Sequence, residues 1–308
     1  MASLKEIRAR ILSVNSTKKI TSAMKMVSAA KLHKSEENTL RFIPYKQKLT
    51  DMLTQYLSNI EPGSVSIPLA EKREVKRAAI VCISSNSGLC GVFNSSVNKL
   101  LNEAISNYQA KNVAISIYPI GKKIADYVNK LGYPVSTDYN YICDKPTYEE
   151  TCKVVQPLVE AYINQEIDEL IVLYNHHKNA AVQIPTHEVL LPLSTEISGT
   201  FSLSVNNTST SSVTEMGGQK ANLIYITEPD IPTVINQLVP NVVRMRFYAA
   251  VLDSTTAEHG ARTTAMQTAS DNASKMIETI TQQYNRVRQE VITNELLDIV
   301  GGSEALRN

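Results

Sequence analysis

Apolar residues recur at helical spacing along the first sixty positions of the chain. Alternating steps of three and four residues indicate a coiled-coil seam at Leu4, Ile7, Ile11 and Val14. After a shift of phase the same steps resume, which predicts a stutter in the seam, at Ile20, Met24 and Val27. The stripe continues at Leu49, Leu53, Tyr56 and Ile60. We therefore expect a long coiled-coil helix over residues 1–60.

The middle of the chain, residues 70–228, changes to short apolar runs that alternate with amphipathic stretches. This texture predicts buried strands at 78–84, 113–120 and 170–174, and helices at 96–110, 122–131 and 148–165. Further strands are candidates at 186–193 and 221–227, with a Ser, Thr and Asn-rich loop at 204–214. Alternating strands and helices predict a Rossmann-like α/β domain with a mainly parallel sheet that helices cover on both faces.

A second long helical pattern occupies residues 231–308. It runs from Ile231 to Val300, and the pair Gly301-Gly302 is a stop signal. Sixty residues of helix span roughly 90 Å, more than a compact domain of this size can bury. Alanine recurs at every fourth position, which predicts a narrow contact face, at Ala257, Ala261, Ala265, Ala269 and Ala273. We expect this helix to pair with the helix of residues 1–60 as a long antiparallel coiled coil.

Charge is distributed unevenly along the chain. The net charge of the 308 residues is only +1, so the global balance implies neither nucleic acid nor an anionic membrane as a partner. The first fifty residues, however, carry eleven Lys and Arg against three Glu. A solvated helix face, a nucleic-acid contact and a contact with acidic protein loops all fit this excess, and the pattern alone favours the solvated face.

No catalytic, cofactor-binding or metal-binding residue is predicted. The segment SGLCGVFN at 87–94 lacks the glycine and lysine pattern of a nucleotide loop, which favours a structural turn. Cys90 has no neighbouring His or acid to activate it, and all four cysteines fit a reduced state in the cytosol. His176 and His177, adjacent in sequence, fit a solvated loop better than a shared metal. No run approaches the roughly 20 apolar residues of a membrane-spanning helix.

Four segments resemble the gamma subunit family of F-type H+-transporting ATP synthases. They are KITSAMKMVSAAKL at 19–32, preceded by LKEIRARI at 4–11; SGLCGVFN at 87–94; EHGARTTAMQTASDN at 258–272; and VITNELLDIVGGSEAL at 291–306. The segments keep the order of the family and span essentially the whole chain. Departures from the usual family residues occur at Asn86, Ser87, Thr263, Thr264 and Asn294.

The resemblance implies a non-catalytic rotor shaft that couples proton flow to ATP synthesis on beta subunits. Implied partners are a hexamer of alpha and beta subunits, the epsilon subunit and the membrane ring of c subunits, without nucleic acid or self-association. Implied contact residues are Arg8, Lys18, Lys19, Met24, Lys25 and Arg262. An apolar tip inside the alpha/beta sleeve is implied for Leu296, Leu297, Ile299, Val300 and Leu306. With no transit peptide, we expect peripheral attachment at the cytoplasmic face of a bacterial inner membrane.

Two other classes of protein remain open at this level. One is a Rossmann-like nucleotide-binding enzyme with helical extensions, which would bind nucleotide or substrate as an isolated chain. The other is a basic coiled-coil scaffold or nucleic-acid binder, whose affinity for DNA would fall steeply with salt.

Overall fold

The computed structural model describes residues 4–58, 67–135, 139–193, 228 and 230–305. The chain divides into two compact units, which are considered separately below. One consists of Met1–Ala29 with Arg262–Asn308, and the other of Ala30–Ala261. The candidate strand at 221–227 and the candidate loop at 204–214 lie outside the described residues.

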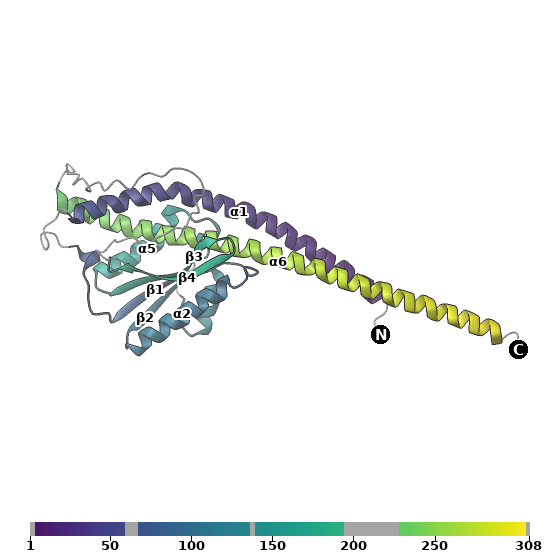
Figure 1. Cartoon of the computed structure of the whole chain (residues 1–308). Coiled ribbons are helices and arrows are strands. Elements are labelled where there is room, and N and C mark those ends of the chain that lie inside the picture. The colour runs from purple at the N-terminus through teal and green to yellow at the C-terminus, as the bar shows by residue number, and fades with distance from the viewer. Residues whose placement is uncertain (1–3, 59–66, 136–138, 194–227, 229, 306–308) are drawn as a thin grey trace. The chain divides into compact units, whose positions relative to one another are not determined.

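Two long helices run through both units. Helix α1 extends over Leu4–Ser58 and helix α6 over Ile231–Ala305, so both predicted helices are confirmed (Figure 1). The predicted stop at Gly301-Gly302 is wrong, because α6 passes through both glycines. A glycine ends a helix when it adopts a positive φ. Among the described residues, positive-φ glycines occur instead at Gly91, Gly121 and Gly132.

A four-stranded sheet forms the centre of the unit Ala30–Ala261. Its strands are β1 (Arg77–Ile83), β2 (Ala114–Ile120), β3 (Glu169–Asn179) and β4 (Val182–Leu191), in the order β2-β1-β3-β4. Strand β1 pairs in parallel with β2 and β3, whereas β4 runs antiparallel to β3. The mainly parallel sheet is therefore confirmed. Strand β3 is longer than the predicted 170–174, because its polar end pairs with β4 in a hairpin.

Helices cover both faces of this sheet. Helices α2 (Phe93–Ala110) and α3 (Lys122–Lys130) pack on one face; α5 (Tyr148–Ile163) and the first part of α6 pack on the other (Figure 1). Side chains alternate along a strand. Ile80 of β1 therefore joins the core under α2, and its neighbour Val81 joins the core under α5 and α6. Two short helices were not predicted, η1 (Pro68–Ala70) and α4 (Tyr141–Asp144).

The segment after β1 supplies hydrogen-bond acceptors for the backbone N–H groups at the start of α3. The first backbone N–H groups of a helix have no acceptor within the helix. Asn86 Oδ1 accepts from the backbone N–H of Lys122 at 3.1 Å, and Ser84 Oγ accepts from that of Ile124 at 3.0 Å. Asn86 Nδ2 also donates to Asp144 Oδ2 at 3.0 Å. Asn86, a departure from the family pattern, thus ties three segments together.

Within the unit Ala30–Ala261, α1 and α6 lie side by side and antiparallel. The hydroxyls of Ser35 and Thr256 are 2.7 Å apart, and the rings of Phe42 and Tyr248 meet edge to face at 5.0 Å. As the chain advances along α1, its partners therefore move back along α6, as the sequence predicted. Leu53 of α1 reaches the core beneath the sheet and is completely buried.

Candidate subunit-contact surface

The unit Met1–Ala29 with Arg262–Asn308 contains the sequence-predicted contact residues. In its part of α1, side chains of reduced exposure include an unbroken heptad pattern, with Ser22 and Met24 beside it: Leu4, Ile7, Ile11, Val14, Lys18, Thr21, Lys25 and Ser28. The predicted phase shift is therefore wrong for two of its three positions, because only Met24 is half-buried. Ile20 and Val27, which the hydrophobic pattern placed on the seam, are 60% and 59% exposed.

The seam passes through polar positions because their side chains suit two helices at close approach. Thr21 and Ser28 are small, and the Thr21 hydroxyl donates to the backbone oxygen of Lys18 at 3.0 Å. Lys18 and Lys25 are half-buried. Long lysine stems can cover apolar surface while their ammonium groups stay in water. Hydrophobicity alone does not reveal such positions, and it therefore favours Ile20 over Thr21.

The irregular step lies in α6 rather than in α1. Its covered positions in this unit include a continuous seam, Met266, Ala269, Ala273, Ile277, Ile280, Tyr284, Val287 and Val291. The steps alternate between three and four residues, except for two consecutive steps of four between Ala269 and Ile277. A seam with such an extra step locally unwinds the supercoil. Ala265 and Ala269 are half-buried and Ala273 is 7% exposed, so the alanine face lies on the covered side.

The side of α1 that faces away from the seam combines apolar and cationic residues. Its exposed members are Arg8, Leu12, Lys19, Ile20, Met26 and Val27. Leu12 and Met26 are 61% and 65% exposed. Contiguous exposed apolar residues with polar neighbours mark interaction sites. Arg8 and Lys19 therefore belong to an outward surface suited to another protein.

The other predicted contact residues are less accessible. Met24 and Lys25 are half-buried, and Arg262 is only 9% exposed. The structure thus brings these three residues into one unit, but it separates them by exposure from the outward Arg8 and Lys19.

From Ile292 to Ser303, α6 is exposed on all sides. The predicted tip residues Leu296, Leu297, Ile299 and Val300 are 58%, 63%, 68% and 57% exposed. Leu306 lies outside the described residues. Leu296 and Ile299 follow Ile292 at helical spacing, so these apolar side chains form a stripe without cover from the described part of this chain. Such a stripe needs another molecule to remove it from water.

The segment SGLCGVFN forms a tight turn between β1 and α2. Ser85 donates its backbone N–H and its hydroxyl to Asn94 Oδ1, at 3.1 and 2.9 Å. Cys90 is 1% exposed and packs with Phe93 against Ala257 of α6. Within the unit Ala30–Ala261, this segment therefore anchors α2 to α6, as expected for a structural turn.

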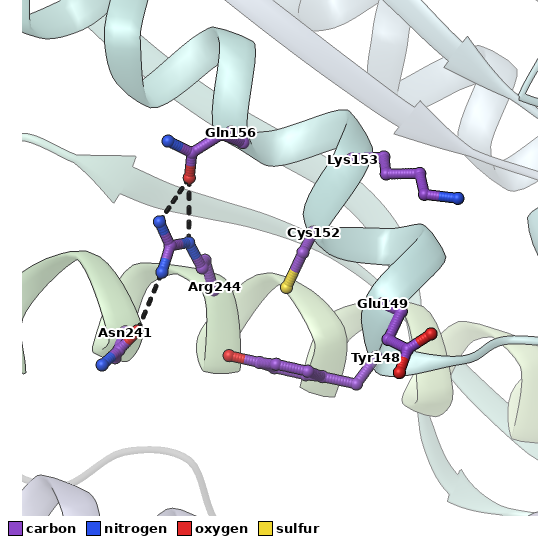
Figure 2. Close-up of a pocket in the computed structure, with 7 residues that line it drawn as sticks. All are labelled: Tyr148, Glu149, Cys152, Lys153, Gln156, Asn241 and Arg244. Atoms are coloured by element: carbon purple, nitrogen blue, oxygen red, sulfur yellow. Dashed lines mark hydrogen bonds between the residues drawn. The ribbon is translucent and has the colours of Figure 1, made fainter.

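A pocket of about 410 Å³ lies between α5 and α6, also in the unit Ala30–Ala261 (Figure 2). Arg244 lines this pocket, and its guanidinium group donates to Gln156 Oε1 and to Asn241 Oδ1. Burial, followed by the nearby Cys152, raises the pKa of Tyr148 to about 12. The Arg244 cation is therefore engaged in joining the helices, and the Tyr148 phenol stays protonated near neutral pH. We assign the pocket to packing rather than to chemistry.

Sequence reasoning placed His176 and His177 in a solvated loop, and the structure corrects this. Both lie in β3, and the side chains are 15% and 14% exposed. His176 Nδ1 is 2.5 Å from Asp253 Oδ2. The sequence carried no local signal for this pair, because Asp253 lies in α6. No cluster of three metal-ligating side chains occurs among the described residues.

A family model described as ATP synthase matches residues 3–306. The ATP synthase gamma chain of Phocaeicola vulgatus is 42% identical, over 99% of this chain and all of the relative. That of Bacteroides thetaiotaomicron is 44% identical, over 98% of this chain and 99% of the relative. The chain belongs to the ATP synthase gamma chain family. The resemblance identified from the four sequence segments is thereby confirmed.

Solved structures support the same fold. A chain of the Euglena gracilis mitochondrial ATP synthase, in an assembly of OSCP, F1 and c-ring, has a TM-score of 0.64 and 18% identity, over 98% of this chain and 94% of that chain. A chain from the central stalk and c-ring of the Tetrahymena thermophila enzyme has a TM-score of 0.55 and 21% identity, over 82% and 99%. Among the described residues, no helix is apolar enough over sufficient length to cross a membrane.

Proposed function

We propose that this chain is the central rotor shaft of an F-type ATP synthase. As a non-catalytic subunit, it couples proton translocation in the membrane sector to ATP synthesis on beta subunits. The observation that carries the proposal is the full-length similarity to ATP synthase gamma chains. The outward face of α1 and the uncovered end of α6 support it, because both present apolar side chains that this unit leaves exposed.

Coupling follows from the unequal sides of the helix pair. The outward side of α1 carries Arg8 and Lys19 among apolar residues, whereas exposed positions of α6 in the same unit carry polar and acidic residues, namely Thr264, Thr268, Asp271 and Glu278. A turning shaft with unequal sides presents a different surface to each of three beta subunits. A ligand shifts a conformational equilibrium only by its differential affinity for the two states. The shaft thus links rotation to nucleotide affinity through a coupling free energy.

The contacts must be reversible for the shaft to turn. Exposed ion pairs are weak, about 1 kcal/mol or less, so contacts of Arg8 and Lys19 with acidic loops can form and break at each step. Leu296, Leu297, Ile299 and Val300 are suited to the apolar sleeve of the alpha/beta hexamer, where non-directional contacts permit rotation. We extend the sleeve contact to Leu306. We assign Lys18 to the contacts with acidic loops, and Met24, Lys25 and Arg262 to the zone where the shaft leaves the sleeve.

The remaining partners follow from the same role. We assign the α/β domain to contacts with the epsilon subunit and the ring of c subunits. This arrangement places the chain peripherally at the cytoplasmic face of the bacterial inner membrane.

Affinity purification of the tagged chain from its own cells tests the proposal. We expect two larger nucleotide-binding subunits to be recovered in excess over the tagged chain, together with ATP hydrolysis in the recovered complex. A chain purified alone that binds nucleotide in calorimetry would favour the enzyme. DNA binding with a steep salt dependence would favour the nucleic-acid binder. Either outcome without the larger subunits contradicts the rotor assignment.

A further inference from the structure

A hydrogen-bonded pair of His176 and Asp253 joins the sheet to α6 inside the unit Ala30–Ala261. Asp253 of α6 is 3% exposed, and its two carboxylate oxygens contact consecutive residues of β3. His176 Nδ1 is 2.5 Å from Asp253 Oδ2, and the backbone N–H of His177 donates to Asp253 Oδ1 at 2.9 Å. The hydrogen bond that His176 makes to the Asp253 carboxylate raises the pKa of His176, which favours the charged imidazolium. We call Asp253, His176 and His177 the β3–α6 joint.

A second tether lies on the same side of the sheet. Arg246 of α6 donates through Nη2 to Glu188 Oε1 of β4 at 2.8 Å, and the Tyr174 hydroxyl of β3 donates to Glu188 Oε2 at 3.1 Å. The pKa of Lys46 from α1 is lowered to about 8, chiefly by burial, while Glu188 and Asp253 oppose that shift.

Helix α1 also reaches the joint directly. His177 Nε2 is 3.5 Å from Glu36 Oε1 of α1. Charged side chains of both long helices thus contact polar residues of β3 and β4, beside an apolar core that α6 shares with the sheet.

The chemistry of the joint differs from that of the surrounding core in its directionality. Apolar contacts have no preferred direction, whereas a hydrogen bond requires a defined orientation of donor and acceptor. A carboxylate that accepts two bonds from one strand fixes the rotation and height of its helix. Buried ion pairs are often replaceable by apolar residues without loss of stability, so stability alone is a weak reason to have one.

We propose that Asp253 is a positioning residue that transmits torque from the α/β domain to α6, held by His176 and His177. The inference rests on the proposed rotor function and deepens it. Torque applied to the sheet reaches the helix through bonds that break only if the helix slips. The apolar packing around the joint keeps the two parts together, and the joint keeps them in register.

The test uses the complete ATP synthase in inverted membrane vesicles, with ATP hydrolysis and ATP-driven proton pumping measured on the same sample. Asp253→Asn preserves shape and removes the charge, and His176→Gln removes the imidazolium. For both variants we expect near-normal assembly and hydrolysis, with the ratio of pumping to hydrolysis lowered severalfold. The double variant is expected to be no worse than either single one, because both break the same bond.

A matched control lies one turn along the same helix. Thr256→Val also removes a buried hydrogen bond of α6, but its partner is Ser35 of α1 rather than the sheet. We expect this variant to keep the normal ratio of pumping to hydrolysis. An unchanged ratio in Asp253→Asn overturns the inference. A proportional fall of both activities with loss of the chain from the complex also overturns it, since that indicates a purely structural role.

Failure of the rotor proposal is distinguishable from failure of the joint. If vesicles that contain the unmodified chain neither assemble the complex nor pump protons, the rotor function itself is wrong. If they pump normally and the joint variants pump equally well per ATP, only the joint is wrong.

Discussion

The hydroxyls of Ser35 and Thr256 form a buried hydrogen bond that joins α1 to α6 at 2.7 Å. Thr256 donates its hydroxyl proton to the backbone oxygen of Leu252 at 2.8 Å, so Ser35 is the donor in the pair. Thr256→Val therefore removes the acceptor of a buried donor, which costs about 1–3 kcal/mol. We expect that decrease in the free energy of unfolding by denaturant. Thr268→Val, an exposed change in α6, should stay within about 0.5 kcal/mol of the unmodified chain.

Gly260 is required where α6 passes the turn of the β3–β4 hairpin. A Cβ atom on Gly260 would lie 3.2 Å from the Cα of Ala180 and 3.4 Å from its backbone oxygen. Because backbone must move to admit a methyl group, Gly260→Ala is expected to lower unfolding stability by about 1–3 kcal/mol. Gly301→Ala is the matched control. It lies in α6 with open space around it, and it should cost nothing or gain up to about 1 kcal/mol of helix propensity.

The stability of the chain should depend on pH through His176. The pKa of His176 is raised in the folded state, first by its hydrogen bond to Asp253. A raised folded pKa contributes stability that is complete below the unfolded value of about 6.5 and is lost as pH rises through the folded value. Denaturant midpoints measured upward from about pH 6 should therefore decline more for the unmodified chain than for His176→Gln. Equal slopes would contradict the assignment.

His177 should act in the opposite direction. Burial lowers its pKa, so its stabilising contribution is present above the unfolded value and is lost as pH falls through the folded one. Lys46, with a folded pKa of about 8, adds stability only as pH rises beyond that value. Comparison of each variant with the unmodified chain at the same pH separates these contributions.

Met24→Lys should weaken coupling. Met24 is half-buried and precedes the half-buried Lys25, so the change places a second cation in partly desolvated surroundings. We expect the ratio of proton pumping to ATP hydrolysis to fall severalfold in vesicles that contain the variant complex. Ser16→Lys adds the same charge at an exposed position of α1 and should leave the ratio unchanged. Normal pumping by Met24→Lys would count against a coupling role for this zone.

Substitutions at the uncovered end of α6 should weaken assembly with other subunits while leaving the folding of the chain unaffected. Leu296 and Ile299 are 58% and 68% exposed. The double variant Leu296→Asp with Ile299→Asp therefore loses little apolar surface that is buried within the chain. The free energy of unfolding of the isolated chain should change by less than about 0.5 kcal/mol. Recovery of alpha and beta subunits with the tagged chain should fall. Equal recovery would show that the apolar stripe is not a contact.

The sequence predicted what depends on local periodicity. The alternation of strands and helices indicated a parallel sheet. The continuous apolar run around Ile80 and Val81 indicated burial on both faces, and the two side chains do lie in the cores on opposite faces of the sheet. Both long helices and their antiparallel pairing were predictable from length and from the alanine spacing. The assignment of the candidate contacts came from the family resemblance, and for Arg8 and Lys19 the structure adds an exposed position.

What the sequence missed depends on partners distant in the chain. Thr21 and Ser28 carry no apolar signal, and they lie on the seam because the facing surface allows close approach. The local sequence favours a loop at His176, because its partner Asp253 is distant in the chain. The path of α6 through Gly301 was missed for a different reason. Glycine permits a left-handed turn but does not impose one.

Polar residues in the middle of the α1 seam also have a mechanical consequence. Thr21, Lys25 and Ser28 place hydroxyl and ammonium groups on the seam where the Leu4 to Val14 stretch places only hydrocarbon, so apolar burial contributes less to holding the two helices together there. A rod with a softer middle section twists elastically under load. In the proposed rotor, this section is therefore where we expect twisting under load to be concentrated.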